Sequence, residues 1–397
     1  MMKRTIKDAK VSGKKLIIRC DFNVPLDENG NITDEKRINS SLQTINYALE
    51  NDAAVILMSH LGRPKGEYKK EFSLKPVAEK LSEKLGKEIF FISSETVISD
   101  DIKKTATDLK NGEILLLENL RFRKEEETGD ETFAKELANL ADIYINDAFG
   151  TAHRAHASTA IIAKFLPSYI GFLMEKEVKF LGDTLENPKR PFLAILGGAK
   201  VSDKIKVIES LLDKVNSLII GGGMAYTFIK GAGSNIGKSL VDESALPLIP
   251  DILKKARAKN VNILIPIDTV SASTFNNDAD IKIVASTRIP DNYQGLDIGP
   301  KTTKLFVDEI KHAKTVFWNG PMGVFEMPNF AEGTKRICEA LANSSAISII
   351  GGGDSAAAAK IFGYADKMTH ISTGGGASLE FIEKGNLPGL EVIPESV

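Results

Sequence analysis

The amino-acid sequence predicts an α/β protein of two lobes, each a parallel β-sheet flanked by helices, joined by an interdomain helix. Three observations support this prediction. Short apolar runs alternate with longer amphipathic stretches, which is typical of βα units around a parallel sheet. The turns after these runs carry arginines and histidines in the first half of the chain and glycines in the second. At 397 residues, the chain also exceeds the usual size of a single hydrophobic core.

The composition excludes several classes of protein. The formal net charge of -2 argues against recognition of nucleic acid or membranes through overall charge. The two cysteines, Cys20 and Cys338, lie far apart and predict neither a disulfide framework nor a zinc site. The stretch MMKRTIKDAK lacks the apolar core of a signal peptide, and no apolar run approaches the roughly 18 residues that span a bilayer. We therefore expect a cytoplasmic protein without nucleic-acid or membrane partners.

The apolar runs of the first half predict a Rossmann-like parallel sheet whose strands end in polar clusters. These runs are KLIIRCDFNV, AAVILMSHLG, EILLLENL and IYINDAFG. Ligands of open parallel sheets bind beyond the carboxyl ends of the strands, and arginine binds carboxylate and phosphate groups in a bidentate manner. Converging arginines here would indicate a small anionic substrate, although each one alone could equally be a solvated surface charge. The clusters and the segments after them contain Asp21, Asn23, Arg37, His60, Arg63, Arg121, Arg123, His153, Arg154 and His156.

Helical periodicity extends from Phe172 to about Leu185 and stops before Pro188 and Pro191. We expect this segment to be the helix that links the two lobes. The runs that follow predict a second Rossmann-like sheet, with strands in FLAILGGAK, SLIIGGGMA, NILIPIDTV, TVFWNGPMG and AISIIGGGDS.

Glycine turns in the second half indicate a phosphate site. In LGGAKVSDKI, Lys200 and Lys204 are four residues apart and share one face if a helix begins there. Ammonium groups beside a helix N-terminus suit a polyphosphate, although a solvated lysine pair is the alternative. In IIGGGDSAAA, the glycines allow the backbone to approach a ligand. Asp354 could hold a magnesium ion or serve only as an N-cap. The stretch STGGGAS repeats the pattern with the hydroxyls of Ser372 and Thr373.

Two other nucleotide motifs are absent. GSNIGKS lacks the first glycine of a Walker loop, because residue 232 is alanine. No strand runs into GxGxxG with an acidic partner at the expected distance, which leaves an NAD-dependent oxidoreductase as a weak alternative.

The motifs together resemble those of the phosphoglycerate kinase family, in order and over essentially the whole chain. The resemblance implies reversible, Mg-dependent phosphoryl transfer between 1,3-bisphosphoglycerate and ADP, giving 3-phosphoglycerate and ATP in glycolysis, by a monomer. Two departures, the shifted glycine in EKGN at 383–386 and Asp242 in place of a glutamate, touch no ligand position. The motifs that carry the resemblance are DFNVP, SHLGRP, LENLRF, NDAFGTAHRAHAS, GGAKVSDKI, GLDIGP, VFWNGPMGVFE, IIGGGDSAAA and ISTGGGASLE.

The resemblance implies a role for each site residue. The phosphoglycerate would be bound by Asp21, Asn23, Arg37, His60, Arg63, Arg121 and Arg154. The nucleotide would be bound by Lys200, Lys204, Gly295, Pro321, Glu326, Gly352, Gly353, Asp354 and Ser355, with Asp354 also contacting the magnesium ion. Charge on the transferring group would be stabilised by Arg37, Lys204, Gly374 and Gly375.

The expected domain organisation follows from these assignments. Residues 1–170 would bind phosphoglycerate, and residues 171–379 would comprise the interdomain helix and the nucleotide-binding domain. Residues 380–397 would pack back on the first domain, as the resemblance implies. Transfer would be direct, with closure about the hinge at 172–185, no general base and no phosphoenzyme, because the acceptor is an ionised carboxylate. A non-catalytic nucleotide-binding regulator on the same fold is the alternative.

Overall fold

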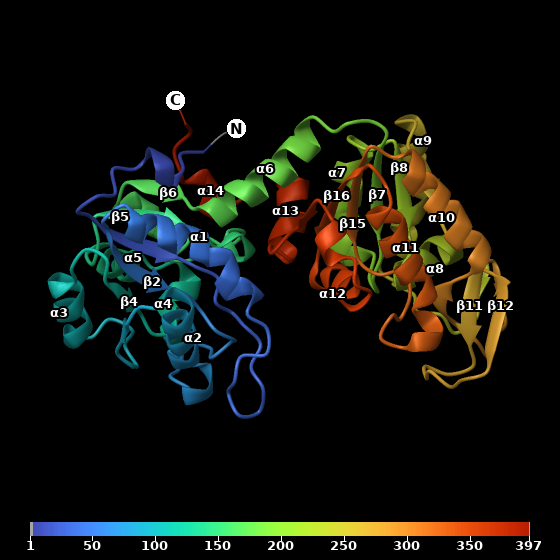
Figure 1. Cartoon of the computed structure of the whole chain (residues 1–397). Helices are drawn as coiled ribbons and strands as arrows, with labels where there is room; N and C mark the ends of the chain where they lie inside the picture. The colour runs from blue at the N-terminus through green and yellow to red at the C-terminus, as the bar shows by residue number, and fades with distance from the viewer. Residues whose placement is uncertain (1–2, 397) are drawn as a thin grey trace. The chain divides into compact units, whose positions relative to one another are not determined.

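The computed structural model describes residues 3–396, apart from the side chains of residues 183, 185 and 186. The chain forms two compact units, Met1–Lys179 with Lys384–Val397 and Phe180–Glu383 (Figure 1). The division falls within helix α6 (Phe172–Glu186) and at the end of helix α13 (Gly376–Lys384). These places lie nine and four residues beyond the domain boundaries at 170 and 379 that we predict from the sequence.

The first unit is built on a six-stranded parallel sheet with the order β3-β4-β2-β1-β5-β6. Its strands are β1 (Lys15–Arg19), β2 (Ala54–Met58), β3 (Ile89–Phe91), β4 (Ile114–Leu116), β5 (Ile143–Asn146) and β6 (Ser168–Ile170). Its helices are α1 (Lys36–Glu50), α2 (Lys75–Leu85), α3 (Asp100–Asp108), α4 (Lys124–Thr128), α5 (Glu131–Ala138) and α14 (Pro388–Glu391).

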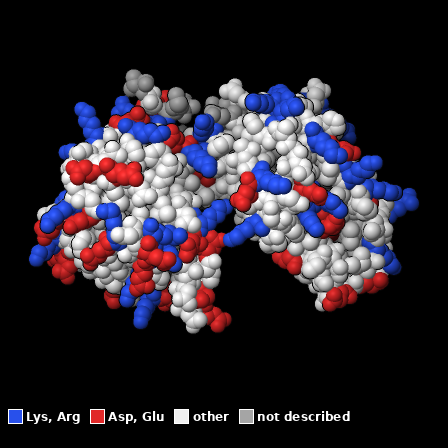
Figure 2. Space-filling view, viewed as in Figure 1, with Lys and Arg blue, Asp and Glu red and all other residues white. Residues whose placement is uncertain are grey.

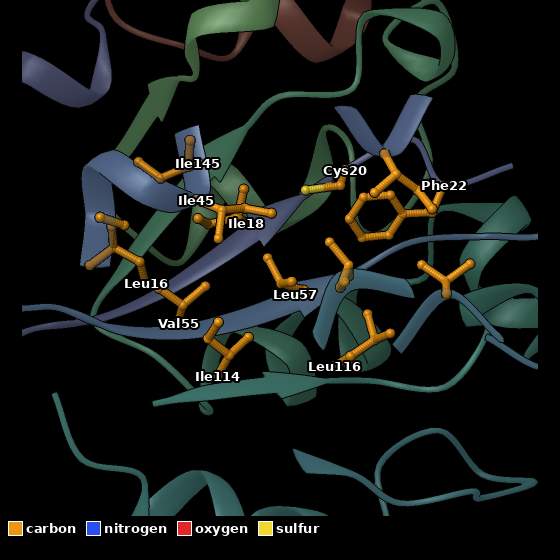
Figure 3. Close-up of a cluster of buried hydrophobic side chains, with 14 of the residues drawn as sticks. Leu16, Ile18, Cys20, Phe22, Ile45, Val55, Leu57, Ile114, Leu116 and Ile145 are labelled. Carbon is orange, nitrogen blue, oxygen red and sulfur yellow. The ribbon is translucent and has the colours of Figure 1, made fainter. Parts of the chain in front are cut away.

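The core of the first unit explains the uniformly apolar runs in the sequence. Every residue of β2 is buried, because helices cover a parallel sheet on both faces and no strand face meets water. Figure 3 shows Ile18, Leu57 and Leu116 from three strands of the sheet packed together with Ile45 from α1. This core fixes the strand ends from which the polar clusters start.

The second unit repeats the architecture with a parallel sheet of order β10-β8-β7-β15-β16-β17. Its strands are β7 (Phe192–Leu196), β8 (Ser217–Ile220), β10 (Asn262–Leu264), β15 (Thr315–Asn319), β16 (Ile347–Gly351) and β17 (His370–Ile371). Its helices are α7 (Ile205–Leu212), α8 (Gly222–Gly231), α9 (Ile249–Ala258), α10 (Pro300–His312), α11 (Glu332–Ala342) and α12 (Gly353–Ile361). Helix α11 contacts both α10 and α12, and helix α9 contacts both α7 and α8. Two parallel sheets, each with flanking helices, confirm the predicted fold class.

Two small sheets extend the second unit. An antiparallel sheet has the order β12-β11-β14, and β9 pairs with β13 in parallel. The sequence runs do not predict the antiparallel sheet, because β12 is mostly exposed and carries no continuous apolar run. The strands concerned are β9 (Asn235–Ile236), β11 (Asp268–Ala272), β12 (Ile281–Ala285), β13 (Arg288–Ile289) and β14 (Gln294–Ile298).

The strand orders place one switch point in each large sheet. In the first sheet, successive strands are added on one side of β1 until β5 pairs on its other side. In the second sheet, β8 and β15 flank β7 in the same way. Crevices at the carboxyl ends of such strand pairs are where open α/β sheets bind ligands. Each unit therefore offers one expected binding position.

Two general expectations can be compared with the structure. Helix α6 begins at Phe172, where the sequence periodicity places it. Positive and negative side chains are intermixed on the face in Figure 2. None of the helices among residues 3–396 combines the length and apolar content needed to cross a membrane.

Candidate active site

The first candidate half-site begins at the carboxyl end of β1. Asp21 is buried and forms an ion pair with Arg37 Nη1 at the start of α1. Asn23 Oδ1 accepts the amide of Gly62 at 2.8 Å, which ties the turn after β1 to the turn after β2. The fold thus brings three of the predicted residues, Asp21, Asn23 and Arg37, to one end of the sheet.

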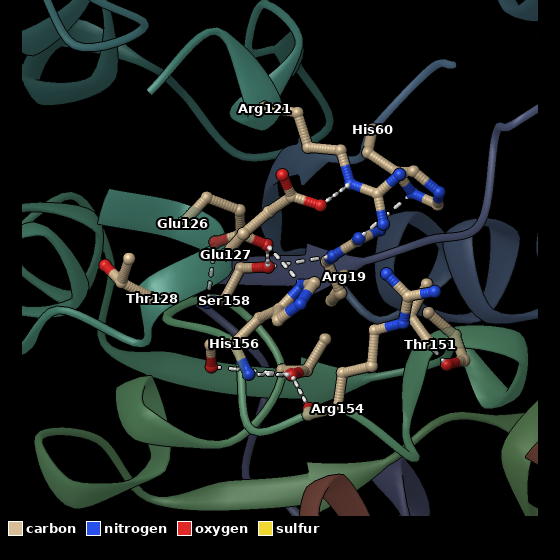
Figure 4. A network of polar contacts seen from close by, with 12 residues as sticks. Arg19, His60, Arg121, Glu126, Glu127, Thr128, Thr151, Arg154, His156 and Ser158 are labelled. Atoms are coloured by element: carbon tan, nitrogen blue, oxygen red, sulfur yellow. Dashed lines mark hydrogen bonds and ion pairs between the residues drawn. The ribbon is translucent and has the colours of Figure 1, made fainter. Parts of the chain in front are cut away.

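The neighbouring strand ends supply further cations. Arg121 follows β4, is 5 % exposed, and donates through Nη1 to the Gly62 carbonyl at 2.9 Å. Arg154 lies in the loop after β5, where its Nε donates to His153 Nε2 at 3.2 Å. Figure 4 shows Arg121 and Arg154 extending toward the same region. Burial lowers the pKa of Arg121, despite the opposing effect of Glu127.

Arg63 differs from the other predicted arginines. It lies in the turn after β2 and is exposed. It makes no hydrogen bond or ion pair with any other residue in the described part of the chain. Its guanidinium is therefore available to a ligand, and its role stays a prediction.

Arg19, in β1 itself, is the functional candidate that the sequence analysis misses. It is fully buried, donates through Nε to Ser158 Oγ at 2.9 Å and contacts His60 Nδ1 through Nη2 at 3.2 Å. Ser158 Oγ in turn donates to the buried Glu126 Oε1 at 2.6 Å. The available signal was the position of Arg19 in the apolar run KLIIRCDFNV. A charged residue in a buried strand is rarely left without polar partners, so this position indicated a buried polar cluster.

His60 and His156 in this cluster have pKa values lowered far enough that both rings are neutral at neutral pH. Burial, helped by Arg19 and Arg121, holds the pKa of His60 well below its ordinary value. The same causes lower the pKa of His156 to about 3. Because a guanidinium only donates, His60 Nδ1 accepts from Arg19 and the ring proton lies on Nε2. Neutral rings add hydrogen-bonding capacity to the arginines without further repulsion.

The second candidate half-site lies at the carboxyl ends of β7 and β15. A Cβ atom on Gly197 would lie 2.0 Å from the Pro321 carbonyl oxygen, and one on Gly320 would lie 2.3 Å from the Gly197 oxygen. The two turns therefore pack backbone against backbone, which only glycine allows. This contact places Pro321, a predicted nucleotide residue, beside the Gly197-Gly198 turn.

Lys204 lies against the same turns. Its Nζ donates to the Gly197 carbonyl at 2.5 Å. Burial lowers the pKa of Lys204 to about 8, against the opposing effects of Asp354 and Asp203. Lys200 and Lys204 would share a helix face only if a helix began before them, and α7 begins only at Ile205. Lys200 precedes the 3-10 turn that contains Lys204 and is exposed.

The glycines at this edge serve two different purposes. A Cβ on Gly222 would meet Gly198 N at 2.7 Å, and one on Gly352 would meet Asn319 Nδ2 at 2.7 Å. These glycines permit close packing within the protein. By contrast, a Cβ on Gly353 or Gly375 would meet no described atom within 4 Å. Their backbones face open space, as an approach to a ligand requires.

The start of α12 fits a magnesium ion that arrives with a nucleotide. The N-cap of this helix is Gly352, so Asp354 is not the N-cap that the sequence left as an alternative. Asp354 is exposed and forms no hydrogen bond or ion pair with another described residue. Residues 3–396 contain no group of three His, Cys, Asp or Glu that could hold a metal. One carboxylate with phosphate oxygens is an arrangement that magnesium accepts.

Ser355 is predicted to bind the nucleotide, yet its side chain points inward. It is fully buried, and its Oγ accepts the Gly320 amide at 2.6 Å. The hydroxyl therefore holds the turn after β15 in place. Only the backbone of Ser355 remains for a ligand.

The other predicted nucleotide residues lie on nearby elements. Gly295, in β14, donates its amide to Ser239 Oγ at 2.9 Å, and a Cβ there would lie 2.1 Å from Tyr226 Oη. Glu326 is exposed in the segment after β15. Gly374 precedes α13, and its amide donates to Ser372 Oγ at 3.1 Å. The ligand roles of these residues stay predictions.

Comparisons with known proteins show which family the chain is similar to over nearly its whole length. A family model described as Phosphoglycerate kinase matches residues 6–385. A phosphoglycerate kinase of Clostridium botulinum (strain Hall) is 56% identical over 392 residues, 98% of each chain. One of Finegoldia magna is 56% identical over 395 residues and the full length of both chains. A solved phosphoglycerate kinase structure from Coxiella burnetii has a TM-score of 0.89 at 41% identity, covering 98% of each chain. One from Pyrococcus horikoshii has 0.81 at 31%, with the same coverage.

Proposed function

The chain belongs to the phosphoglycerate kinase family, and from this premise we propose how its residues perform the reaction. The enzyme transfers a phosphoryl group reversibly between 1,3-bisphosphoglycerate and ADP, giving 3-phosphoglycerate and ATP. One observation carries the assignment of roles. The carboxyl ends of the strands carry different groups in the two parallel sheets, buried or exposed arginines in the first and close-packed glycine turns with Lys204 in the second.

The first unit binds the phosphoglycerate in this proposal. Arg63, Arg121 and Arg154 supply planar guanidinium groups for the carboxylate and the phosphate. Asp21 holds Arg37 through their ion pair. His60 and His156 remain neutral and contribute hydrogen bonds without charge. Asn23 completes this set by joining the turns after β1 and β2.

The second unit binds the nucleotide. Lys204, whose ammonium lies beside the Gly197 carbonyl, binds the phosphates together with Lys200. The start of α12 offers the amides of Gly352 and Gly353, and the helix dipole favours an anion there. Gly295, Pro321 and Glu326 contact the nucleoside. The magnesium ion neutralises phosphate charge when bound, and Asp354 is the residue that would hold it.

The transfer needs positioning and charge stabilisation rather than a base. In the ATP-consuming direction the nucleophile is a carboxylate, which is ionised at neutral pH. Arg37, Lys204 and the amides of Gly374 and Gly375 stabilise charge on the equatorial oxygens of the transferring group, for which the Gly374 amide would have to exchange its bond to Ser372 Oγ. Because the ligands bind to different units, we expect the units to close during turnover about a hinge at 172–185 and exclude water. No phosphoenzyme forms in this scheme.

A non-catalytic regulator on the same fold is not favoured, because the chain retains the residues of both half-sites. We also expect a monomer that acts in the cytoplasm, which the glycolytic role of the family supports.

A coupled assay with magnesium, ATP and 3-phosphoglycerate tests the proposal. Turnover should require all three components. Arg37→Ala should lower kcat by roughly 10²- to 10³-fold, as for one preorganised donor, with ADP affinity nearly unchanged. Arg336→Ala is the control, since the ion pairs of Arg336 within the described residues are with Glu332 and Glu339 on its own helix α11. A large loss of ADP affinity in Arg37→Ala would contradict the assignment of half-sites.

A further inference from the structure

Two consecutive side chains at the carboxyl end of β5 hold both chain segments that run between the compact units. Asn146 and Asp147 are fully buried, and neither is predicted to touch a ligand. We propose that they are positioning residues, which fix the connecting segments and the loop of Arg154 to one strand end. The proposal rests on the phosphoglycerate-binding role proposed for the first unit.

Asn146 fastens the C-terminal segment to the loop after β5. Its Nδ2 donates to the Gly389 carbonyl at 2.9 Å and to the Thr159 carbonyl at 3.2 Å. Its Oδ1 accepts the amide of Ala148 at 3.3 Å. The side chain thus joins two positions in the loop after β5 to Gly389 in the C-terminal segment, which is far away in the sequence. Loss of the Asn146 bond to the Gly389 carbonyl would be costly if that group stayed buried, whereas the Thr159 carbonyl also accepts from Tyr144 Oη at 3.2 Å.

The contacts of Asn146 lead directly to Arg154. Thr159, whose carbonyl accepts from Asn146, donates through its own hydroxyl to the Arg154 carbonyl at 2.6 Å. Gly389 donates its amide to the Ala152 carbonyl at 2.8 Å, two residues before Arg154. A Cβ on Gly389 would lie 3.1 Å from both Ala152 Cα and Asn146 Nδ2. The loop is therefore held on two sides by bonds that converge on Asn146.

Asp147 fastens the other connecting segment. Its Oδ1 accepts the amide of Met174 in the first turn of α6 at 3.1 Å. The amide of Phe172 donates to Thr44 Oγ1 at 2.9 Å, which anchors the same turn to α1. A Cβ on Gly171 would lie 2.3 Å from Asp147 Oδ1, so the chain enters the helix pressed against this carboxylate. A carboxylate at the N-terminus of a helix also favours its dipole.

The arrangement connects three functional parts through one strand end. The Asp147 amide donates to the Arg19 carbonyl at 2.9 Å, so this end is also fixed to the strand that carries the buried guanidinium. Loosening Asn146 would let the Arg154 loop and the C-terminal segment shift together. Loosening Asp147 would free the first turn of α6. Small displacements of a binding group are sufficient to lower turnover strongly.

The test compares side-chain deletions with a core deletion in the same strand. Asn146→Ala removes the contacts to Gly389 and Thr159, and Asp147→Ala removes the contact to Met174. Asp147→Asn is the conservative variant, because its amide oxygen can still accept. Ile145→Ala is the matched control, since Ile145 is fully buried in β5 and makes no polar side-chain contact. Asn146→Ser, which keeps one donor, replaces Asn146→Ala if that variant does not fold.

The readouts are the Kd of 3-phosphoglycerate and of ADP by titration calorimetry, and kcat and KM in the coupled assay. We expect Asn146→Ala to weaken 3-phosphoglycerate binding about 10-fold and to leave ADP binding within about twofold. We expect Asp147→Ala to lower kcat about 10-fold and Asp147→Asn to retain it. Ile145→Ala should change neither ligand's Kd.

The outcomes separate this proposal from the proposed function. A wild-type protein that neither binds 3-phosphoglycerate nor turns over overturns the function. An active wild type whose Asn146→Ala variant binds both ligands like Ile145→Ala overturns the positioning role of Asn146. Equal kcat values for Asp147→Ala and Asp147→Asn overturn the role of Asp147.

Discussion

Two alanine substitutions at glycines should have opposite effects on stability and the same effect on nucleotide binding. At Gly197, a Cβ would lie 2.0 Å from the Pro321 oxygen, whereas ordinary contacts begin at 3.4 Å. The backbone of one turn must therefore move. At Gly353, a Cβ would meet no described atom within 4 Å, and the residue is the first of α12. Alanine fits there without strain in the free protein.

The expected magnitudes follow from these distances. Overpacking at Gly197 should cost about 1–3 kcal/mol of unfolding free energy. Alanine at Gly353 should add up to about 0.5–1 kcal/mol, because glycine is the poorer helix former. For a unit of this size, ~1 kcal/mol corresponds to about 2–4 °C in Tm. Gly197→Ala should thus lower the Tm of the second unit and Gly353→Ala should raise it slightly.

Both variants should bind ADP more weakly. Gly197→Ala displaces the turns beside Lys204, and Gly353→Ala places a methyl group where we propose that phosphate approaches the backbone. A tenfold increase in Kd would correspond to ~1.4 kcal/mol. Differential scanning calorimetry and titration calorimetry with MgADP measure the two effects. Wild-type ADP affinity in Gly353→Ala would refute the view that this glycine faces the ligand, and unchanged Tm in Gly197→Ala would refute the packing argument.

Three further predictions concern titration and motion. The pKa of Lys204 is lowered to about 8, so the charge of its side chain is lost as the pH rises through that value. The Kd of ADP should therefore increase between pH 7 and pH 9.5, which titration calorimetry measures. In Lys204→Arg, the Kd of ADP should no longer depend on pH in this range. Burial raises the pKa of Asp147 from 3.8 to about 7, so between these values the unfolded state binds fewer protons, and the contribution of this group to stability should fall as pH rises. Urea unfolding of the wild type and Asp147→Asn tests that sign, and identical pH profiles would contradict it. Addition of both ligands should make the molecule more compact in small-angle scattering, and an unchanged profile would argue against closure.

The parallel sheets could be predicted because each strand is a local signal. Runs such as FLAILGGAK carry their apolar pattern and their terminating glycines within ten residues. The antiparallel sheet of β11, β12 and β14 was not predicted, because its edge strand β12 is mostly exposed and carries no continuous apolar run.

Candidate site residues could be predicted from the sequence where a polar side chain directly follows a strand. Asp21, Asn23 and Arg37 do come together after β1. The position of Arg19 in an apolar run was a signal of burial, but its partners could not be predicted, because Ser158 and His60 lie on other segments. For the same reason, the sequence could not separate Gly197, which packs against Pro321, from Gly353, which faces open space.

The central claim is that each unit carries one half of the site, and paired binding measurements test it most directly. Titration calorimetry of Arg37→Ala and Lys204→Ala with 3-phosphoglycerate and with MgADP gives four affinities. The account predicts a crossed result, in which Arg37→Ala loses affinity for 3-phosphoglycerate alone and Lys204→Ala loses affinity for ADP alone. Loss of both ligands in either variant, or of the opposite ligand, would contradict it.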